Sequence, residues 1–450
     1  MNIVLLSGGS GKRLWPLSNE IRSKQFIRIF RRPEHSAPLG TETAGEYESM
    51  VQRVYRQILA ADPEARVTIA TSKSQVSAIH HQLGEDVGIS VEPCRRDTFP
   101  AIALAAAFLH DVQGVPEEEA VVVCPVDPYV EDAYFRCLGE LRAAAQQGDK
   151  RLILMGIEPT YPSEKYGYII PRKREGDGET VYSFTEKPDR ERAAEYIRAG
   201  ALWNGGVFAF RLSYMLEKSR ELLGTSEYRA LFDRYAELPK ISFDYAVAEK
   251  ESSLAVIPYA GTWKDLGTWN TLTEAMEGPS VGDVRMNERC VNTHVINETG
   301  VPIVCMGLKD LVVSASPDGI LVSDKEQSSY IKPFVDAIDR QIMFAEKSWG
   351  SYRVLDVEED SLTIKVTLNP GNRMNYHSHE RRDEVWTVLS GSGRAVVDGV
   401  SREVAPGDVI RMQAGQKHTV IAGDGGLQLV EVQLGRDISV KDKKKYCLEE

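Results

Sequence analysis

The sequence predicts an α/β protein: a mainly parallel sheet covered by helices on both faces, then β-rich chain and a small C-terminal β-barrel. Two observations lead to this fold class. Through about residue 260, short apolar runs alternate with amphipathic segments, a pattern typical of strands and helices joined by right-handed crossovers. From about Pro279 onward, the helical periodicity gives way to short β-rich pieces separated by Gly, Asn and Asp.

The elements follow in order along the chain. Apolar runs predict buried strands at residues 2–6, 67–71, 89–93, 120–127 and 152–159. Apolar residues at three- and four-residue spacing predict helices at Met50–Ala61, Pro100–Val112 and Asp132–Gln147. Residues 291–300 and 310–324 read as strands of a connector, and a helix-like stretch covers Tyr330 to Phe344. We therefore expect three domains at 1–278, 279–345 and 346–450.

Composition and charge exclude several classes of protein. The chain has 450 residues, 42% hydrophobic and 27% charged, as ordinary globular proteins do. No apolar run approaches the roughly 20 residues that cross a bilayer, and the six cysteines form no CxxC pair. The net charge of −12 argues against a nucleic-acid binder. We expect a cytoplasmic homo-oligomer that binds neither nucleic acid nor membrane.

The N-terminal segment is a basic exception in this acidic chain. Its first 32 residues hold seven Lys and Arg against the single acid Glu20. Gly8, Gly9 and Gly11 follow the first predicted strand, where the backbone must turn and approach a ligand closely. Together with the basic side chains that follow, such a turn suits phosphate. The segment matches neither a P-loop, since Arg13 follows Lys12, nor a dinucleotide fingerprint, since Leu14 replaces the third glycine.

Motifs in family order identify a resemblance. GGSGKRLWPLS followed by SKQF resembles the signature of mannose-1-phosphate guanylyltransferases, a branch of the sugar-phosphate nucleotidyltransferases. Further matches are VEPCRRDTFPAIALAA, CPVDP, YGYI, FTEKP, WNGGVFAF and WKDLGTW, which end at Trp269. The resemblance implies a Rossmann-like nucleotidyltransferase domain that transfers GMP from GTP to mannose-1-phosphate, with Mg²⁺, and releases pyrophosphate.

The resemblance also implies roles for individual residues. Arg13, Lys24 and Lys187 would be catalytic, holding the triphosphate and the sugar phosphate. Gly8, Gly9, Gly11 and Lys12 would line the nucleotide, and Gly167, Glu186 and Asn204 the sugar. Asp127 and Asp265 would hold Mg²⁺, a cation that prefers carboxylate oxygens. Asp127 also stands at the end of a predicted strand, where ligands of parallel sheets bind.

Departures from the family pattern leave the identity of the sugar and the base undecided. They are Ser23 for Pro, Asp97 for Asn, Pro128 for His, and Gly205 with Val207 for Ser and Met. None removes a proposed cation or metal ligand, but selectivity depends on pocket contacts that a sequence does not display. Another sugar-1-phosphate, or a nucleotide-sugar sensor without turnover, stays an alternative.

The C-terminal segment carries a second candidate site. Between Gly371 and Gly391, the spacing of His377, His379 and Glu384 resembles the first cupin motif, and His418 completes the set. Alternation on a strand places the first two histidines on one face. Three His and one Glu suit Zn, Fe, Mn or Ni. Bifunctional relatives carry a phosphomannose isomerase here, acting on mannose-6-phosphate, but usually with Gln at position 377. An isomerase and a structural or regulatory metal module therefore both stay open.

Overall fold

The computed structural model describes residues 1–8, 12–19, 21–33, 46–173, 180–338, 341–436, 438 and 442–448. The chain forms two compact units. The first comprises Met1–Gly9, Ser49–Val76 and Asp86–Leu266, and the second comprises Ser10–Glu48, Ser77–Glu85 and Gly267–Glu450. This grouping differs from the three predicted domains, because two N-terminal segments join the C-terminal part of the chain. The boundaries at 278 and 345 stay a prediction.

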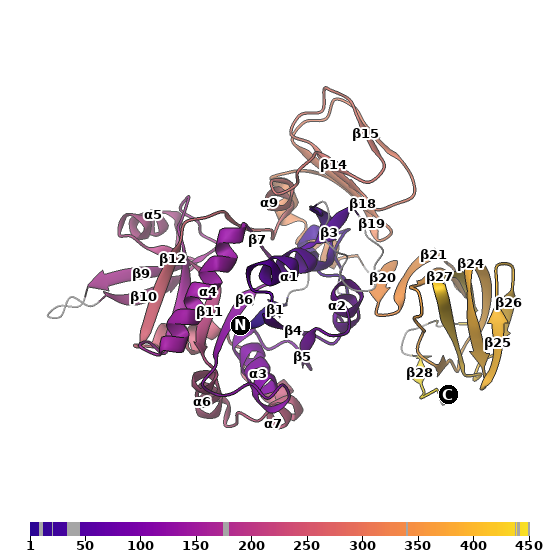
Figure 1. Cartoon of the computed structure of the whole chain (residues 1–450). Helices are drawn as coiled ribbons and strands as arrows, with labels where there is room; N and C mark the ends of the chain where they lie inside the picture. The colour runs from indigo at the N-terminus through magenta and orange to yellow at the C-terminus, as the bar shows by residue number, and fades with distance from the viewer. Residues whose placement is uncertain are drawn as a thin grey trace. The chain divides into compact units, whose positions relative to one another are not determined.

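The first unit is built on a large sheet whose centre is parallel. Figure 1 shows β1, β4 and β6 side by side, and β1 pairs in parallel with both neighbours. The strands are β1 (Asn2–Ser7), β4 (Arg66–Ser72), β5 (Gly88–Glu92), β6 (Ala120–Pro125), β8 (Leu152–Ile157), β9 (Gly167–Lys173), β10 (Thr180–Glu186), β11 (Leu202–Arg211) and β12 (Leu254–Tyr259). Antiparallel β11 joins the centre to β8 and β9. The mainly parallel sheet is as predicted.

Helices cover both faces of this sheet. Val4 and Leu6 of β1 face a core shared with α3 and α6, while Ile3 and Leu5, which are equally apolar, point to the opposite face and are completely buried there. The helices of the unit are α1 (Met50–Ala61), α3 (Thr98–Asp111), α4 (Asp132–Gln147), α5 (Arg190–Arg198), α6 (Leu212–Leu223), α7 (Tyr228–Asp233) and α8 (Phe243–Ala246). Strands buried on both faces explain the unbroken apolar runs of the sequence.

Capping residues set the helix ends. Ser49 and Gln52 form a reciprocal capping box at the start of α1. α4 ends at Gly148, whose left-handed φ of 80° suits glycine. Both helices have the predicted bounds. α3 begins at Thr98, two residues before the predicted start, because the Asp97 side chain accepts the Thr98 N–H.

The second unit contains the basic N-terminal segment and a β-rich connector. The connector strands are β14 (Ser280–Val281), β15 (Val284–Met286), β16 (His294–Asn297), β17 (Ile303–Cys305), β18 (Leu311–Ser316) and β19 (Gly319–Asp324). Arg22 makes a bidentate pair with Glu298 at 2.5 and 2.9 Å. Arg28 pairs with the buried Glu346, and although burial opposes the charge of this carboxylate, the cations of Arg28 and Arg22 lower its pKa to about 2. These pairs fix the N-terminal segment to the connector and the barrel.

The C-terminal part is a curled antiparallel sheet. Its strands are β20 (Phe344–Lys347), β21 (Gly350–Val357), β22 (Ser361–Leu368), β23 (His377–Ser378), β24 (Asp383–Val397), β25 (Val400–Val404), β26 (Val409–Met412), β27 (His418–Leu434) and β28 (Lys444–Lys445). The long strands β24 and β27 pair along most of their length and enclose Trp386, Met412 and Leu429. The predicted cupin barrel is confirmed as a curled sheet.

Two further predictions meet the structure with different outcomes. The five predicted strands are found within two residues of their expected ends. The prediction of a helix from Tyr330 to Phe344 is wrong. The helix α10 covers only Lys332–Asp336, and Phe344 begins β20 because its backbone pairs with Arg353 of β21. Among the described residues, no helix is both long and apolar enough to span a bilayer.

Candidate functional site

A pocket of about 440 Å³ opens at the carboxyl ends of the central strands of the first unit. Ser7 and Gly8 reach it from β1, Ser72 from β4, Glu92 from β5, and Asp127 from the loop after β6. β1 lies between β4 and β6, so later strands of the chain are added to the sheet on opposite sides of β1. Open α/β sheets bind ligands at such topological switch points.

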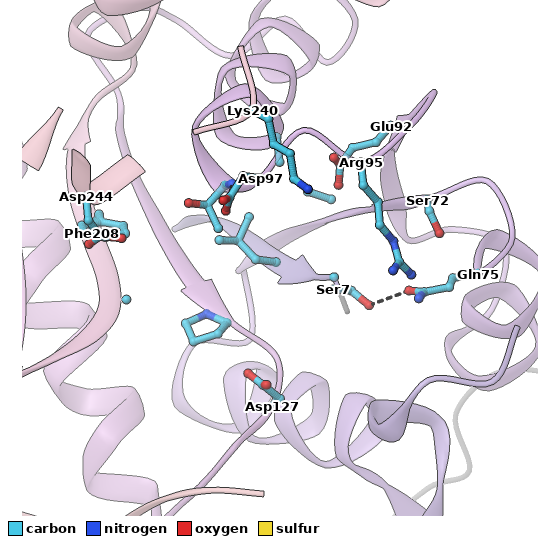
Figure 2. A pocket seen from close by; sticks show the side chains of 17 residues that line it. Ser7, Ser72, Gln75, Glu92, Arg95, Asp97, Asp127, Phe208, Lys240 and Asp244 are labelled. Carbon is cyan, nitrogen blue, oxygen red and sulfur yellow. Dashed lines mark hydrogen bonds between the residues drawn. The ribbon is translucent and has the colours of Figure 1, made fainter. Parts of the chain in front are cut away.

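Charged side chains line one part of this pocket. Figure 2 shows Lys240, Asp97, Glu92 and Arg95 gathered on the side away from Asp127. Tyr235 donates a hydrogen bond of 2.8 Å to Glu92, and burial raises the pKa of that carboxyl. The pocket therefore offers the cations of Arg95 and Lys240 together with carboxylates at one end, and the carboxylate of Asp127 at the other. The two cations suit an anionic portion of a ligand.

The two proposed magnesium ligands lie at neighbouring positions. Asp127 directly precedes β7 (Pro128–Val130), and Asp265 ends β13 (Trp263–Asp265). The two short strands pair antiparallel, with Asp265 opposite Pro128, the residue next to Asp127. Strand pairing thus places two acidic residues that are 138 residues apart in sequence at neighbouring backbone positions. Their role as magnesium ligands stays a proposal.

The proposed sugar-binding residues also come together. Glu186 lies opposite Gly167 in the β9–β10 pair. A Cβ built on Gly167 would lie 2.6 Å from Glu186 Oε2 and 3.6 Å from the Asn204 Cβ, so both side chains flank the bare glycine. Lys187 follows with a left-handed φ of 46° and forms an ion pair with Glu186. Three elements of the sheet thus place an acid, an amide and a cation around one glycine.

Asp244 is a residue of this cluster that the sequence analysis missed. It lies in the short helix α8 and, like Phe208, lines the pocket (Figure 2). Asn204 Nδ2 donates to Asp244 Oδ1 at 2.5 Å, while Asn204 Oδ1 accepts the Gly206 N–H at 3.1 Å. Burial raises the pKa of Asp244. An acid inside the otherwise apolar run ISFDYAVA was the available signal.

The cationic residues of the N-terminal segment belong to the second unit. There Lys12 pairs with Asp336 at 3.0 Å, Arg13 is exposed, and Lys24 lies in a short 3-10 turn (Lys24–Phe26). Gly8 lines the pocket described above, in the first unit. Gly9 and Gly11 lie outside the described residues. The phosphate-binding roles of these residues stay proposals.

The cupin histidines and the glutamate form one buried cluster. One potential ligand atom from each of His377, His379, Glu384 and His418 lies within 4.8 Å of all the others. The four side chains are at most 2% exposed. Two come from paired strands, since His377 of β23 is opposite His418 of β27, and Glu384 comes from β24. The predicted four-residue set is thus brought together.

Hydrogen bonds orient all three imidazoles toward the centre of the cluster. Each Nδ1 lies 2.6 to 2.9 Å from a backbone carbonyl oxygen: His377 from that of Asn375, His379 from that of Asp442, and His418 from that of Gln416. A carbonyl only accepts, so each Nδ1 carries the hydrogen and each Nε2 keeps a lone pair for a ligand. Burial also lowers the pKa of His377 to about 2, which keeps this ring neutral.

The cluster fits a divalent cation. His418 Nε2 and Glu384 Oε2 are buried 3.1 Å apart without forming a hydrogen bond, and neutral imidazoles with a carboxylate are the donor set of Zn, Fe, Mn and Ni sites. Arg382 closes one side, donating to Glu384 Oε1 at 3.1 Å and lying 3.0 Å from His379 Nε2. The structure does not distinguish these metals.

Two further ionisable groups near the cluster were not found from the sequence. Glu431 of β27 is 3% exposed, accepts from Gln433 Nε2 at 2.5 Å, and has its second oxygen unpaired. Burial, and then the charge of Glu384, raises the pKa of Glu431 to about 8, and burial lowers that of Lys443 to about 8. Acidic and amide residues at the inward positions of an alternating strand were the available signal.

Comparisons with known proteins decide the family. Residues 2–279 match the family model of nucleotidyl transferases, and residues 364–432 match that of the cupin domain. The chain belongs to the nucleotidyl transferase family. Family membership confirms the fold class and the resemblance that the ordered sequence motifs indicated.

Relatives extend the similarity over the whole chain of this nucleotidyl transferase. It is 31% identical to the xanthan biosynthesis protein XanB of Xanthomonas campestris pv. campestris (strain B100), over 98% of this chain and 97% of that one. It is 28% identical to a mannose-1-phosphate guanylyltransferase of Escherichia coli (strain K12), over 99% and 97%. A solved structure titled mannose-1-phosphate geranyltransferase, from Thermus thermophilus, aligns with a TM-score of 0.61 and 30% identity, covering 75% of this chain and 99% of that one.

Proposed function

We propose that the chain transfers GMP from GTP to mannose-1-phosphate, giving GDP-mannose and pyrophosphate. The observation that carries the proposal is the pocket at the switch point of the sheet, which Gly8 and Asp127 both line, while Asp265 pairs with Pro128, the residue after Asp127. Relatives that cover nearly the whole chain are named mannose-1-phosphate guanylyltransferase, which supports this choice of substrates.

In the proposed reaction, a phosphate oxygen of mannose-1-phosphate attacks the α-phosphorus of GTP. The bond between the α-phosphorus and the oxygen that bridges it to the β-phosphorus breaks, and pyrophosphate leaves with that oxygen. Such transfers depend on positioning and on cations that stabilise the departing charge. Arg13 and Lys24 would hold the triphosphate, and Lys187 would hold the sugar phosphate. Asp127 and Asp265 would hold a magnesium ion, which supplies positive charge to the phosphates when bound. Glu186 and Asn204 would bind sugar hydroxyls beside Gly167.

A matrix of nucleoside triphosphates against sugar-1-phosphates tests this function. Pyrophosphate release by the purified full chain is measured with magnesium for each pair. We expect the highest kcat/KM with GTP and mannose-1-phosphate. A higher value for another pair would move the assignment to that sugar or base. Binding of GTP without release from any pair would identify a nucleotide-sugar sensor instead.

A second activity is proposed for the cupin part: conversion of mannose-6-phosphate to fructose-6-phosphate. The buried metal cluster favours it, and the buried Glu431, whose second oxygen has no hydrogen-bond partner, would be the group that moves a proton between C1 and C2. The test is fructose-6-phosphate formation by the full chain with Zn, Fe, Mn or Ni. Absence of product with all four metals would leave a structural or regulatory metal module.

We also propose a cytoplasmic location. All six cysteines lie in the described part of the chain and are free, including the exposed Cys447. Free thiols suit a reducing compartment. A homo-oligomer stays a proposal.

A further inference from the structure

The three histidines of the cupin cluster are oriented by carbonyls of different origin. His377 and His418 each use the carbonyl two residues earlier, at Asn375 and Gln416, so the chain directly before each histidine sets the ring orientation. His379 uses the carbonyl of Asp442, 63 residues away in sequence, at 2.8 Å. The orientation of one ligand in three therefore depends on the chain after the last long strand, β27.

This terminal segment, residues 442–446, is attached to β23, the strand that carries His377 and directly precedes His379. β28 pairs antiparallel with β23, with Lys445 opposite His377 and Lys444 opposite Ser378. The Asp442 carboxylate accepts the backbone N–H groups of Glu380 and Arg381 at 3.2 and 3.0 Å. The Asp442 side chain thus fixes the position of its own carbonyl beside His379.

Tyr446 holds the other end of residues 442–446. Its N–H donates to the Tyr376 carbonyl at 2.9 Å, and its hydroxyl lies 3.1 Å from the Ser378 hydroxyl oxygen. The Lys417 ammonium lies 4.5 Å from the centre of its ring, a cation–π contact. With contacts at both ends, the segment is part of the folded cupin.

We propose that residues 442–446 complete the metal site by fixing His379 with Nδ1 protonated and Nε2 directed at the metal. The proposal rests on metal binding by the cluster. Outer hydrogen-bond partners of ligating histidines typically change metal affinity by about 10- to 100-fold. Without the Asp442 carbonyl, His379 Nδ1 loses the backbone acceptor that holds the ring in this orientation, so the free site is less organised.

Charge makes the direction of the effect diagnostic. Residues 442–446 hold three lysines against the single acid Asp442, and they bring Lys443 near Glu384 and His377. Removing this net positive charge from a cation site would by itself favour metal binding. A loss of affinity on removal of the segment therefore reports lost orientation of His379, because the change in charge acts in the opposite direction.

The test compares two truncated chains: one ends at residue 441, and its control ends at Tyr446. Bound metal is first removed with a chelator, and the Kd for Zn²⁺ is then measured by competition with a chromophoric chelator. The variant Glu384→Gln, which lacks one ligand of the cluster, measures how much zinc binds elsewhere on the chain. We expect the control to match the full chain and the shorter chain to bind about 10- to 100-fold more weakly. Equal affinity of the two truncated chains would overturn the proposal.

A point variant tests the same proposal without truncating the chain, in case the shorter chain does not fold. Asp442→Ala removes the two contacts to the Glu380 and Arg381 N–H groups, and Asp424→Ala removes an exposed acid of the same domain. We expect a several-fold weaker Kd for the first and no change for the second. Unchanged affinity in Asp442→Ala overturns the proposal, and a full chain that binds no zinc at the cluster overturns the metal site itself.

Discussion

At the scale of single residues, Asp244 shows how a buried acid can direct a ligand-binding amide. Its carboxylate accepts from Asn204 Nδ2 at 2.5 Å, which leaves the second N–H of this amide for a ligand and fixes the plane of the group. A residue that positions Asn204 in this way should affect the binding of mannose-1-phosphate and not the binding of GTP.

We predict that Asp244→Ala raises the KM for mannose-1-phosphate about 10-fold, the value of one hydrogen bond to a charged group, and leaves the KM for GTP unchanged. Asp244→Asn, whose amide oxygen still accepts, should recover most of the loss. Steady-state kinetics with each substrate varied in turn measure both effects, with Asp149→Asn at an exposed position as the control. Equal increases in both KM values would contradict a role in positioning Asn204.

Gly167 gives a second prediction at this scale. A methyl group there would lie 2.6 Å from Glu186 Oε2, so Gly167→Ala must displace the carboxylate that is proposed to bind the sugar. The KM for the sugar phosphate should rise, by about 10-fold or more. Gly139→Ala is the matched control: nothing lies within 4 Å of its Cβ, and alanine inside α4 should stabilise the fold by about 0.5–1 kcal/mol. An unchanged KM in Gly167→Ala would argue against this sugar site.

At the scale of elements, the connector strand β16 carries a histidine that makes its stability depend on pH. Burial, and then the Lys325 cation, lowers the pKa of His294 to about 4, whereas the unfolded chain takes up this proton near pH 6.5. The unfolded state therefore binds more protons between these values, so the contribution of His294 to stability is present above pH 6.5 and is lost as the pH falls toward 4.

We predict that lowering the pH from 7 to 5 lowers the free energy of unfolding of the wild type by about 1 kcal/mol more than that of His294→Gln. This difference is smaller than the full pKa shift implies, because the ring is only half-buried and solvent screens its charge. Urea unfolding at both pH values measures the difference. The same loss in both proteins would show that His294 takes up a proton equally easily in the folded and the unfolded chain.

Elements with complete local signals were predictable. The capping box at Ser49 and the terminal Gly148 define α1 and α4 without tertiary information. The helix expected from Tyr330 to Phe344 failed because pairing between β20 and β21 takes Phe344 into a strand, a long-range contact that periodicity does not contain. Pairing of β7 with β13 was equally invisible, although it brings Asp127 and Asp265 together.

At the scale of the whole molecule, the sequence predicted the fold class and the four residues that gather in the cupin cluster, but it missed the groups that distant segments of the chain supply. His377, His379 and Glu384 lie within eight residues that span the end of β23 and the start of β24, so one sequence motif contains all three. Asp244, Glu431 and the Asp442 carbonyl reach their sites from helix, strand and tail segments with no fixed spacing to any motif. Only the folded chain shows these neighbours.

The central claim is that Asp127 and Asp265, side by side through the β7–β13 pair, support nucleotidyl transfer with one divalent ion. The most direct test is magnesium-dependent pyrophosphate release from GTP and mannose-1-phosphate by Asp127→Asn and Asp265→Asn, with Asp149→Asn as the control. We predict that each of the first two variants loses at least about 100-fold in kcat and that the control retains full activity. Full activity with an unchanged magnesium requirement in either aspartate variant would contradict the account.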